Sequence, residues 1–192
     1  MNVLIKRLAV YCGARPGCNE EYIDLAAEFG KSMAQNGIDL VYGGGKFGLM
    51  GAVANAVLDN GGEAYGVITQ ELYERNTSLD RLTDLKITPN MDVRKETMMQ
   101  MADGLVALPG GLGTAEEIIQ AASWTGVGDN AKPVVFFNYN HFYDTMRQQF
   151  EVMHQEGFLE EEYLAAISFA DDFETMMKFM DQYQAPHYRQ YH

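Results

Sequence analysis

The chain has 192 residues, of which 47% are hydrophobic and 21% are charged. This length supports one substantial hydrophobic core but hardly two, and the composition argues against a disordered or coiled-coil chain. Its 14 Lys and Arg residues stand against 27 Asp and Glu residues, which gives a net charge of −13. So large an acidic excess repels a phosphate backbone and argues against nucleic-acid binding, although a small phosphate ligand stays compatible with it.

The sequence carries no recognisable targeting or metal-binding signal. Charged residues arrive within the first seven positions, before any long apolar run, and no stretch reaches the ~18 apolar residues that a membrane helix needs. The only cysteines are Cys12, expected to end a buried strand, and Cys18, so a disulfide framework is not expected. The four histidines lack metal-ligand spacing. We therefore expect a cytoplasmic protein with no metal and no membrane partner.

Short apolar runs alternate with longer segments of helical periodicity along the chain. In chain order we expect a strand at 8–12, a helix at 20–35, a strand at 39–42, a helix from the next glycine turn to about 59, a strand at 63–68, a loop at 69–82, a strand at 85–88, a helix at 92–102, a strand at 104–108, a helix at 114–124, a strand at 133–137, a helix at 141–155, a short strand at 166–169 and a helix at 171–183.

This alternation predicts an α/β fold, with a doubly wound parallel sheet of about six to seven strands covered by helices on both faces. Residues 1–184 are expected to form a single domain, and 185–192 a loose tail. Ligands of such sheets bind beyond the carboxyl ends of the strands. Three glycine-bearing turns fall there: Cys12–Gly13, Gly43–Gly45 and Pro109–Gly111.

The turn at Gly43–Gly45 leads into the segment Lys46–Gly51. Gly43, Gly45 and Gly48 have the spacing of a dinucleotide fingerprint, but the acidic residue expected at the end of the following strand is missing. A nicotinamide site is therefore not favoured. Gly44 and Gly45 still permit close approach of an anion at a helix N-terminus, and the alternative is a tight structural turn.

The second glycine motif is Leu108–Glu117. Gly110, Gly111 and Gly113 form a loop that can wrap an anion with its N–H groups, and a helix follows at once. The alternative is structural, because Thr114 and Glu117 also have the spacing of a capping box. A capping box does not explain the three glycines, so we favour an anion site.

Arg94 and Lys95 form the third motif, at the start of the helix that precedes the second glycine motif. A guanidinium offers a planar fork to phosphate or carboxylate. The alternative, a solvated basic pair, is left open. Two methionine groups, 98–101 and 176–180, are typical of core or of subunit contacts.

Together these residues resemble the Lonely Guy family, the cytokinin riboside 5′-monophosphate phosphoribohydrolases. The family hallmark PGGxGTxxE is present unbroken from Pro109 to Glu117. The family's Arg-Lys pair, with a preceding Met, corresponds to Arg94, Lys95 and Met91, and its GGG turn with Gly-Leu-Met-Gly to 43–51. The early Cys12–Gly13 turn and the late segment Glu156–Phe158 also match, so the similarity spans about 8–180.

The resemblance implies a Rossmann-like fold, a homodimer and hydrolysis of adenosine-type 5′-monophosphates. Members of the family often carry an older label of lysine decarboxylase, but this sequence offers no pyridoxal-binding constellation. Three positions depart from the family pattern. Ala14 replaces a usual Ser, Asn76 falls where the family has a substrate-contacting Glu, with Glu74 as a substitute nearby, and Ser123 replaces a substrate-contacting Thr.

Cleavage of a ribose C1′–N bond passes through an oxocarbenium-like state, which a carboxylate stabilises. Glu117 is the candidate for this role and for the base that activates water, and Glu116, about 100° around the helix, is the alternative. Arg94, aided by Lys95, is expected to orient the reacting groups or pair with the phosphate.

The 5′-phosphate is assigned to Gly110, Gly111, Gly113 and Thr114. Gly44, Gly45 and Ser123 complete the expected substrate contacts, and no cofactor or metal is required. A nucleotide-binding protein without turnover remains the alternative, and the natural base, adenine or a prenylated adenine, is left open.

Overall fold

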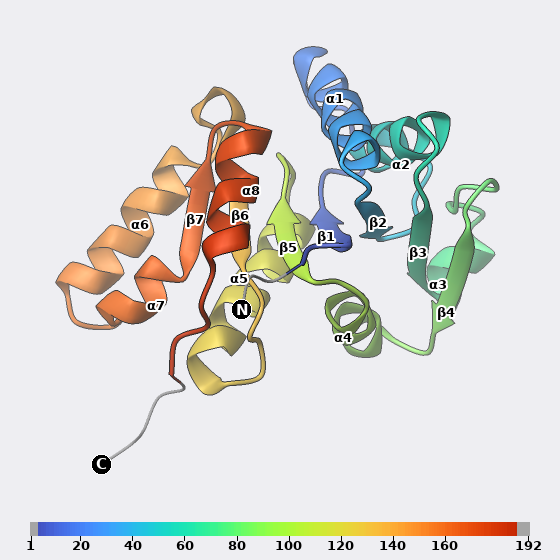
Figure 1. Cartoon of the computed structure of the whole chain (residues 1–192). Helices are drawn as coiled ribbons and strands as arrows, with labels where there is room; N and C mark the ends of the chain where they lie inside the picture. Colours follow the sequence, from blue (N-terminus) through green and yellow to red (C-terminus); the bar gives the residue numbers. More distant parts are fainter. Residues whose placement is uncertain (1–3, 188–192) are drawn as a thin grey trace.

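The computed structural model describes residues 4–187. Seven parallel strands form one sheet in the order β4-β3-β2-β1-β5-β6-β7 (Figure 1). The strands are β1 Arg7–Tyr11, β2 Asp39–Tyr42, β3 Ala64–Thr69, β4 Asp84–Thr88, β5 Gly104–Ala107, β6 Val134–Phe137 and β7 Ile167–Ala170. The predicted doubly wound parallel α/β fold is thereby confirmed.

The helices before β7 connect successive strands, the last helix follows β7, and together they cover both faces of the sheet (Figure 1). They are α1 Glu21–Gln35, α2 Gly48–Asp59, α3 Gln70–Glu74, α4 Met91–Met101, α5 Leu112–Val127, the 3-10 helix η1 Tyr139–His141, α6 Asp144–Gln155, α7 Glu161–Ala165 and α8 Phe173–Gln182.

Side chains that alternate along each strand build a separate core on each face of the sheet. On β1, Leu8 and Val10 pack with residues of α1, α2 and α8, whereas Ala9 and Tyr11 pack with residues of α4, α5 and α6. All four side chains are buried. Strands buried on both faces are typical of parallel sheets, and this explains why their sequences are almost continuously apolar.

The strand order reverses between β1 and β5, which lie side by side at the centre of the sheet. At such a switch point, the connections leave towards opposite sides and open a crevice at the carboxyl ends of the strands. The turn after β1 and the loop after β5 meet there, because the Gly13 N–H donates to the Pro109 carbonyl at 3.0 Å. Two of the three predicted glycine turns therefore share one site.

Four details differ from the sequence-based expectation. The segment predicted as a loop at 69–82 contains α3, whose first turn is capped by the Thr69 side chain. Helix α7 occupies a segment for which no helix was predicted, and the helix predicted from 141 begins at Asp144, after the 3-10 turn η1. Helices α3 and α7 have five residues each, too few for a helical period to stand out.

The fourth difference concerns α5, which was predicted from 114 but begins at Leu112. Most of the predicted tail, 188–192, lies outside the described residues, and 185–187 have no regular structure.

Candidate active site

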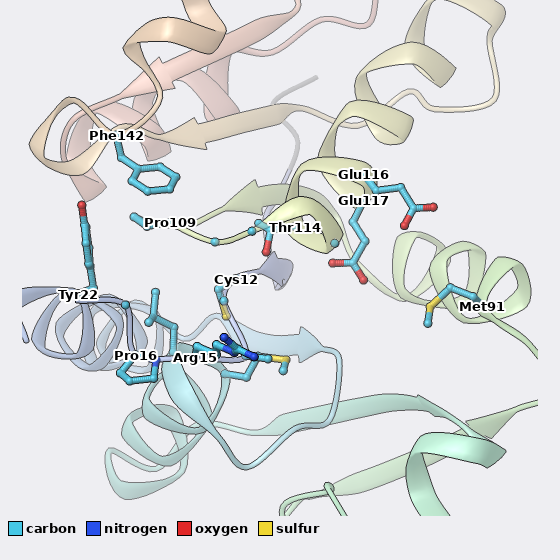
Figure 2. A pocket seen from close by; sticks show the side chains of 18 of the residues that line it. Cys12, Arg15, Pro16, Tyr22, Met91, Pro109, Thr114, Glu116, Glu117 and Phe142 are labelled. Atoms are coloured by element: carbon cyan, nitrogen blue, oxygen red, sulfur yellow. The ribbon is translucent and has the colours of Figure 1, made fainter. Parts of the chain in front are cut away.

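A cavity of about 530 Å³ opens at the crevice between the carboxyl ends of β1 and β5. Figure 2 shows the loop after β1 on one side of it and the start of α5 on the other. Met91 and the two glutamates lie at one end, and Tyr22 and Phe142 at the opposite end (Figure 2). The lining residues are Cys12, Gly13, Ala14, Arg15, Pro16, Gly17, Tyr22, Leu49, Met50, Met91, Arg94, Pro109, Gly110, Gly111, Gly113, Thr114, Glu116, Glu117 and Phe142.

The N-terminus of α5 faces this cavity without a side-chain cap. Gly111 is the N-cap residue, and Leu112, Gly113 and Thr114 form the first turn, whose N–H groups have no partner within the helix. Thr114 is 5% exposed, and its hydroxyl makes no hydrogen bond to any residue that the structure describes. The first-turn amides, the helix dipole and this hydroxyl form an arrangement suited to bind an anion, called below the anion-binding arrangement.

The capping-box alternative for Thr114 and Glu117 is excluded by the start of α5. A capping box requires Thr114 to be the N-cap residue, whereas it is the third residue of the helix. Glu117 lies one turn further and accepts a hydrogen bond from Arg94 instead. The sequence pattern did not reveal that α5 begins at Leu112, because Gly113 in its first turn lowers the helix propensity.

Glu117 and Arg94 form a nearly buried ion pair at the base of the cavity. Arg94 Nη1 lies 2.9 Å from Glu117 Oε1, and the two side chains are 9% and 13% exposed. Burial raises the pKa of the Glu117 carboxyl above its ordinary value, while the neighbouring guanidinium acts in the opposite direction. This environment holds a carboxylate at a fixed position with little water around it.

Arg94 is itself held from two further sides. Its Nε donates to the Val67 carbonyl on β3 at 2.9 Å, and its Nη1 lies 3.2 Å from the Met91 sulfur. A Cβ atom at Gly43 would collide with Arg94 Nη2, so any larger residue there would have to displace the guanidinium. Gly43 thus leaves room for the guanidinium in the candidate site.

The rest of the Gly43–Gly45 turn is bound to the segment after α3. Leu79 N–H donates to the Gly44 carbonyl, Lys46 N–H donates to the Thr77 carbonyl, and Gly45 forms a β-bridge with Ser78. Neither Gly44 nor Gly45 lines the cavity. The Gly44 carbonyl is therefore engaged in structure, and Gly45 is held in the β-bridge.

Glu116, the other candidate carboxylate, has a different environment. It accepts a hydrogen bond from Lys95 Nζ at 2.6 Å, and its side chain is 58% exposed, although it lines the cavity mouth. The hydrogen bond to Glu116 is the main cause that raises the pKa of Lys95. Lys95 therefore supports Glu116 and does not itself line the cavity.

Seven predicted site residues come together in the cavity, and four do not line it. Arg94, Glu116, Glu117, Gly110, Gly111, Gly113 and Thr114 line it. Gly44, Gly45, Lys95 and Ser123 do not, and Ser123 is exposed on α5.

At the family-variant positions, Ala14 lines the cavity, whereas Glu74 and Asn76 line a separate hollow of about 480 Å³ near α3.

Sequence reasoning missed three further residues that face the cavity. Arg15, Tyr22 and Phe142 line it, and the rings of Tyr22 and Phe142 meet edge to face with their centroids 5.9 Å apart. No motif marks these positions. The one available signal was that Arg15 is a cation two residues after the Cys12–Gly13 turn. Cys12 also lines the cavity, and burial raises the pKa of its thiol, which keeps it neutral.

Among solved structures, the fold resembles two proteins of molybdenum cofactor handling. One is the molybdenum cofactor carrier protein from Chlamydomonas reinhardtii, with a TM-score of 0.67 and 22% identity over 92% of this chain and 96% of that one. The other is the molybdenum cofactor binding protein from Rippkaea orientalis, with a TM-score of 0.66 and 18% identity over 90% of this chain and 93% of that one. At these identities the likeness concerns the fold alone.

Closer relatives are found by sequence. The cytokinin riboside 5′-monophosphate phosphoribohydrolase LOG of Oryza sativa subsp. japonica is 40% identical over 82% of this chain, a match that spans 65% of its own length. The enzyme of that name from Rhodococcoides fascians is 39% identical over 80% of this chain and 78% of its own. A family described as "Possible lysine decarboxylase" matches residues 50–180. On these matches, the chain belongs to the Lonely Guy family.

Proposed function

We propose that this protein hydrolyses the N-glycosidic bond of purine ribonucleoside 5′-monophosphates and releases the free base and ribose 5-phosphate. The observation that carries the proposal is the pairing of two features in one cavity. An uncapped helix N-terminus suited to a phosphate lies one helical turn from a nearly buried carboxylate, Glu117. The names of the rice and Rhodococcoides relatives support the same reaction.

Each part of the reaction has a candidate group. The phosphate would bind the amides of Gly111–Thr114, which brings the ribose towards Glu117. The Glu117 carboxylate would stabilise positive charge at C1′ and take a proton from the attacking water. Arg94 keeps this carboxylate in place.

Between the two glutamates, the environment favours Glu117 as the catalytic residue. A carboxylate that is 13% exposed acts on a developing charge through little water, whereas Glu116 is 58% exposed. Glu116 lies at the cavity mouth and suits a contact to ribose hydroxyls. Its ion pair with Lys95 holds it there.

A decarboxylase activity, as the family description suggests, has no support in the cavity. Pyridoxal enzymes attach their cofactor to a lysine, and the lining contains none. Lys95, which pairs with the lining residue Glu116, is also engaged by Asp92. The phosphoribohydrolase proposal uses the residues that do line the cavity.

The test compares AMP with adenosine. If the phosphate site drives binding, AMP should be cleaved with a much higher kcat/KM than adenosine, and chromatography should detect adenine and ribose 5-phosphate in equal amounts. Equal rates for nucleoside and nucleotide would contradict the proposal. AMP binding without any base release would instead support a nucleotide-binding protein without turnover. An N6-prenylated AMP in the same assay identifies the preferred base.

We also propose a homodimer in the cytoplasm. The methionines first considered for subunit contact do not support it. Met98, Met99, Met176 and Met180 are buried core residues, and Met101 and Met177 are partly buried against the core. Exposed apolar side chains on α4 and α5 support it instead: Val93 is 38%, Leu112 91% and Val127 53% exposed. Light scattering at micromolar concentration should give twice the 21.5 kDa chain mass, and a monomer would contradict the proposal.

The proposed cytoplasmic location agrees with the state of the two cysteines. Cys12 and Cys18 are both free thiols, as is usual in the cytoplasm.

A further inference from the structure

Arg15 is a cation in the cavity with no charged partner. It lies in the loop between β1 and α1, lines the cavity and is exposed to solvent. Within residues 4–187, it makes no hydrogen bond, ion pair or cation-π contact through its side chain. Its charge is available to a ligand.

The other cation of the cavity, Arg94, is already engaged. Two of its nitrogens donate to the Glu117 carboxylate and the Val67 carbonyl, and the third packs over Gly43. Moving it to a phosphate would leave Glu117 buried without its counter-ion. Among the described lining residues, Arg15 is therefore the cation that can neutralise a bound anion.

The backbone that carries Arg15 is held firmly in place. A Cβ atom at Gly48 would lie 2.5 Å from the Ala14 carbonyl carbon and 2.5 Å from the Arg15 nitrogen, so this loop packs directly on the start of α2. The Leu49 N–H donates to the Gly13 carbonyl at 3.0 Å, which fixes the loop from the same side. The guanidinium thus extends from a fixed base, and less ordering is needed when a ligand binds.

Across the cavity from Arg15 stands the anion-binding arrangement of α5. Figure 2 shows Arg15 on the wall below and Thr114 on the wall above, with Cys12 between them. The Thr114 hydroxyl belongs to a residue that is 95% buried, lines the cavity and has no hydrogen-bond partner among the described residues. The carboxylates of the cavity, Glu116 and Glu117, are paired with Lys95 and Arg94 and leave Arg15 unclaimed.

We propose that Arg15 binds the substrate's 5′-phosphate from the side opposite the α5 N-terminus and thereby sets the preference for nucleotide over nucleoside. The proposal rests on the proposed function, because it assigns a second contact to the same phosphate. First-turn amides and the Thr114 hydroxyl contact one side of the dianion, and the guanidinium contacts the other with a planar pair of donors. Arg15 is a binding residue, so its effect falls on KM and spares the chemical step.

The experiment compares Arg15→Gln, Arg15→Lys and a matched control, Arg75→Gln. The control removes the same charge from an exposed ion pair on the surface, Arg75 with Glu71. For Arg15→Gln, we expect KM for AMP to rise at least ~10-fold with kcat nearly unchanged, since a hydrogen bond to a charged group is lost. Slow cleavage of adenosine should not change, Arg15→Lys should recover part of the loss, and the control should behave as the native protein.

Binding measurements separate this proposal from the proposed function. Calorimetry with AMP and with inorganic phosphate, on the native protein and on Arg15→Gln, needs no turnover. Weaker binding of both ligands to Arg15→Gln supports the role of Arg15 even if the native protein cleaves no AMP. Equal binding and equal KM in Arg15→Gln and Arg75→Gln would overturn it. A parallel loss for adenosine would also overturn it, because the effect would then not depend on the phosphate.

Discussion

Two glycine-rich turns follow the strands that flank β1. They look alike in the sequence, but they have different surroundings in the structure. Gly43–Gly45 follows β2, and Pro109–Gly111 follows β5. Both precede a helix, and both were predicted to bind an anion. Only the second lines the cavity, whereas the first is bound to the segment 77–79 and makes room for Arg94.

The difference lies in what occupies the N-terminus of the following helix. At α2, the amides of Leu49 and Met50 donate to the Gly13 carbonyl at 3.0 and 3.4 Å, so another part of the chain takes the place of an anion. At α5, the amides of the first turn face an open cavity. A glycine pattern therefore predicts that another group comes close to the backbone of the turn. The surrounding chain decides whether that group is another backbone segment, a side chain or a ligand.

The largest expected effect comes from the carboxylate beside the second turn. Glu117→Gln should lower kcat for AMP by at least ~10²-fold, because in the proposed mechanism Glu117 is the base and supplies the negative charge near C1′. AMP should still bind, since the first-turn amides of α5 are untouched. The melting temperature should fall as well, because Arg94 loses its counter-ion. Adenine release and calorimetric AMP binding measure the two quantities.

Glu116→Gln is the matched control for this change, because it removes the same charge from the adjacent residue. Its ion pair with Lys95 is largely exposed, so stability should change by less than ~1 kcal/mol. A loss of turnover in Glu116→Gln that equals or exceeds that in Glu117→Gln would move the catalytic role to Glu116.

A glycine substitution in each turn tests the comparison directly. Gly43→Ala should displace Arg94 and lower the free energy of unfolding by ~1–3 kcal/mol, as overpacking does, and turnover should fall with it. Gly113→Ala meets no atom within 4 Å, so stability should be unchanged or higher. Its methyl group would, however, stand at the cavity wall, and KM for AMP should rise several-fold.

Denaturant unfolding and AMP kinetics on these two variants are the measurements. A Gly43→Ala protein with native stability and a selective rise in KM would mean that the first turn also binds the phosphate. An unchanged KM for AMP in Gly113→Ala would contradict the assignment of the anion site to the second turn.

A smaller effect is expected from Thr114→Val, which replaces the hydroxyl by a methyl group of similar size. Because Thr114 is not the N-cap residue, stability should change by less than ~0.5 kcal/mol, whereas loss of an N-cap residue costs ~1 kcal/mol. KM for AMP should rise about tenfold through loss of one hydrogen bond to phosphate. A marked fall in melting temperature without a change in KM would restore the capping role.

The sequence predicted most of the fold, because strong periodicities and glycine turns are local signals. It also brought Arg94 and Glu117, 23 positions apart, into one site through the family hallmarks. It did not predict that α5 begins at Leu112, since three glycines in four positions suggest a loop. It did not predict a role for Arg15 either. A single cation becomes a candidate binding residue only when the structure shows that it has no partner and faces the opposite wall of the cavity.

The smallest expected effect is the pH dependence that Glu117 imparts to stability, and its sign opposes that of activity. Burial raises the pKa of Glu117 in the folded protein above its ordinary value of 4.5. The folded state therefore holds this proton more tightly than the unfolded state does. Its stabilising contribution is fully present below the unfolded pKa and is lost as pH rises through the folded pKa. The proposed mechanism requires the ionised carboxylate, so kcat/KM should rise over the same pH interval, with a midpoint above that of an ordinary glutamate. Denaturant unfolding of the native protein and of Glu117→Gln from acidic to neutral pH isolates this contribution. A native protein that becomes more stable relative to Glu117→Gln as pH rises would mean that the Arg94 ion pair, and not burial, dominates the environment of this carboxylate.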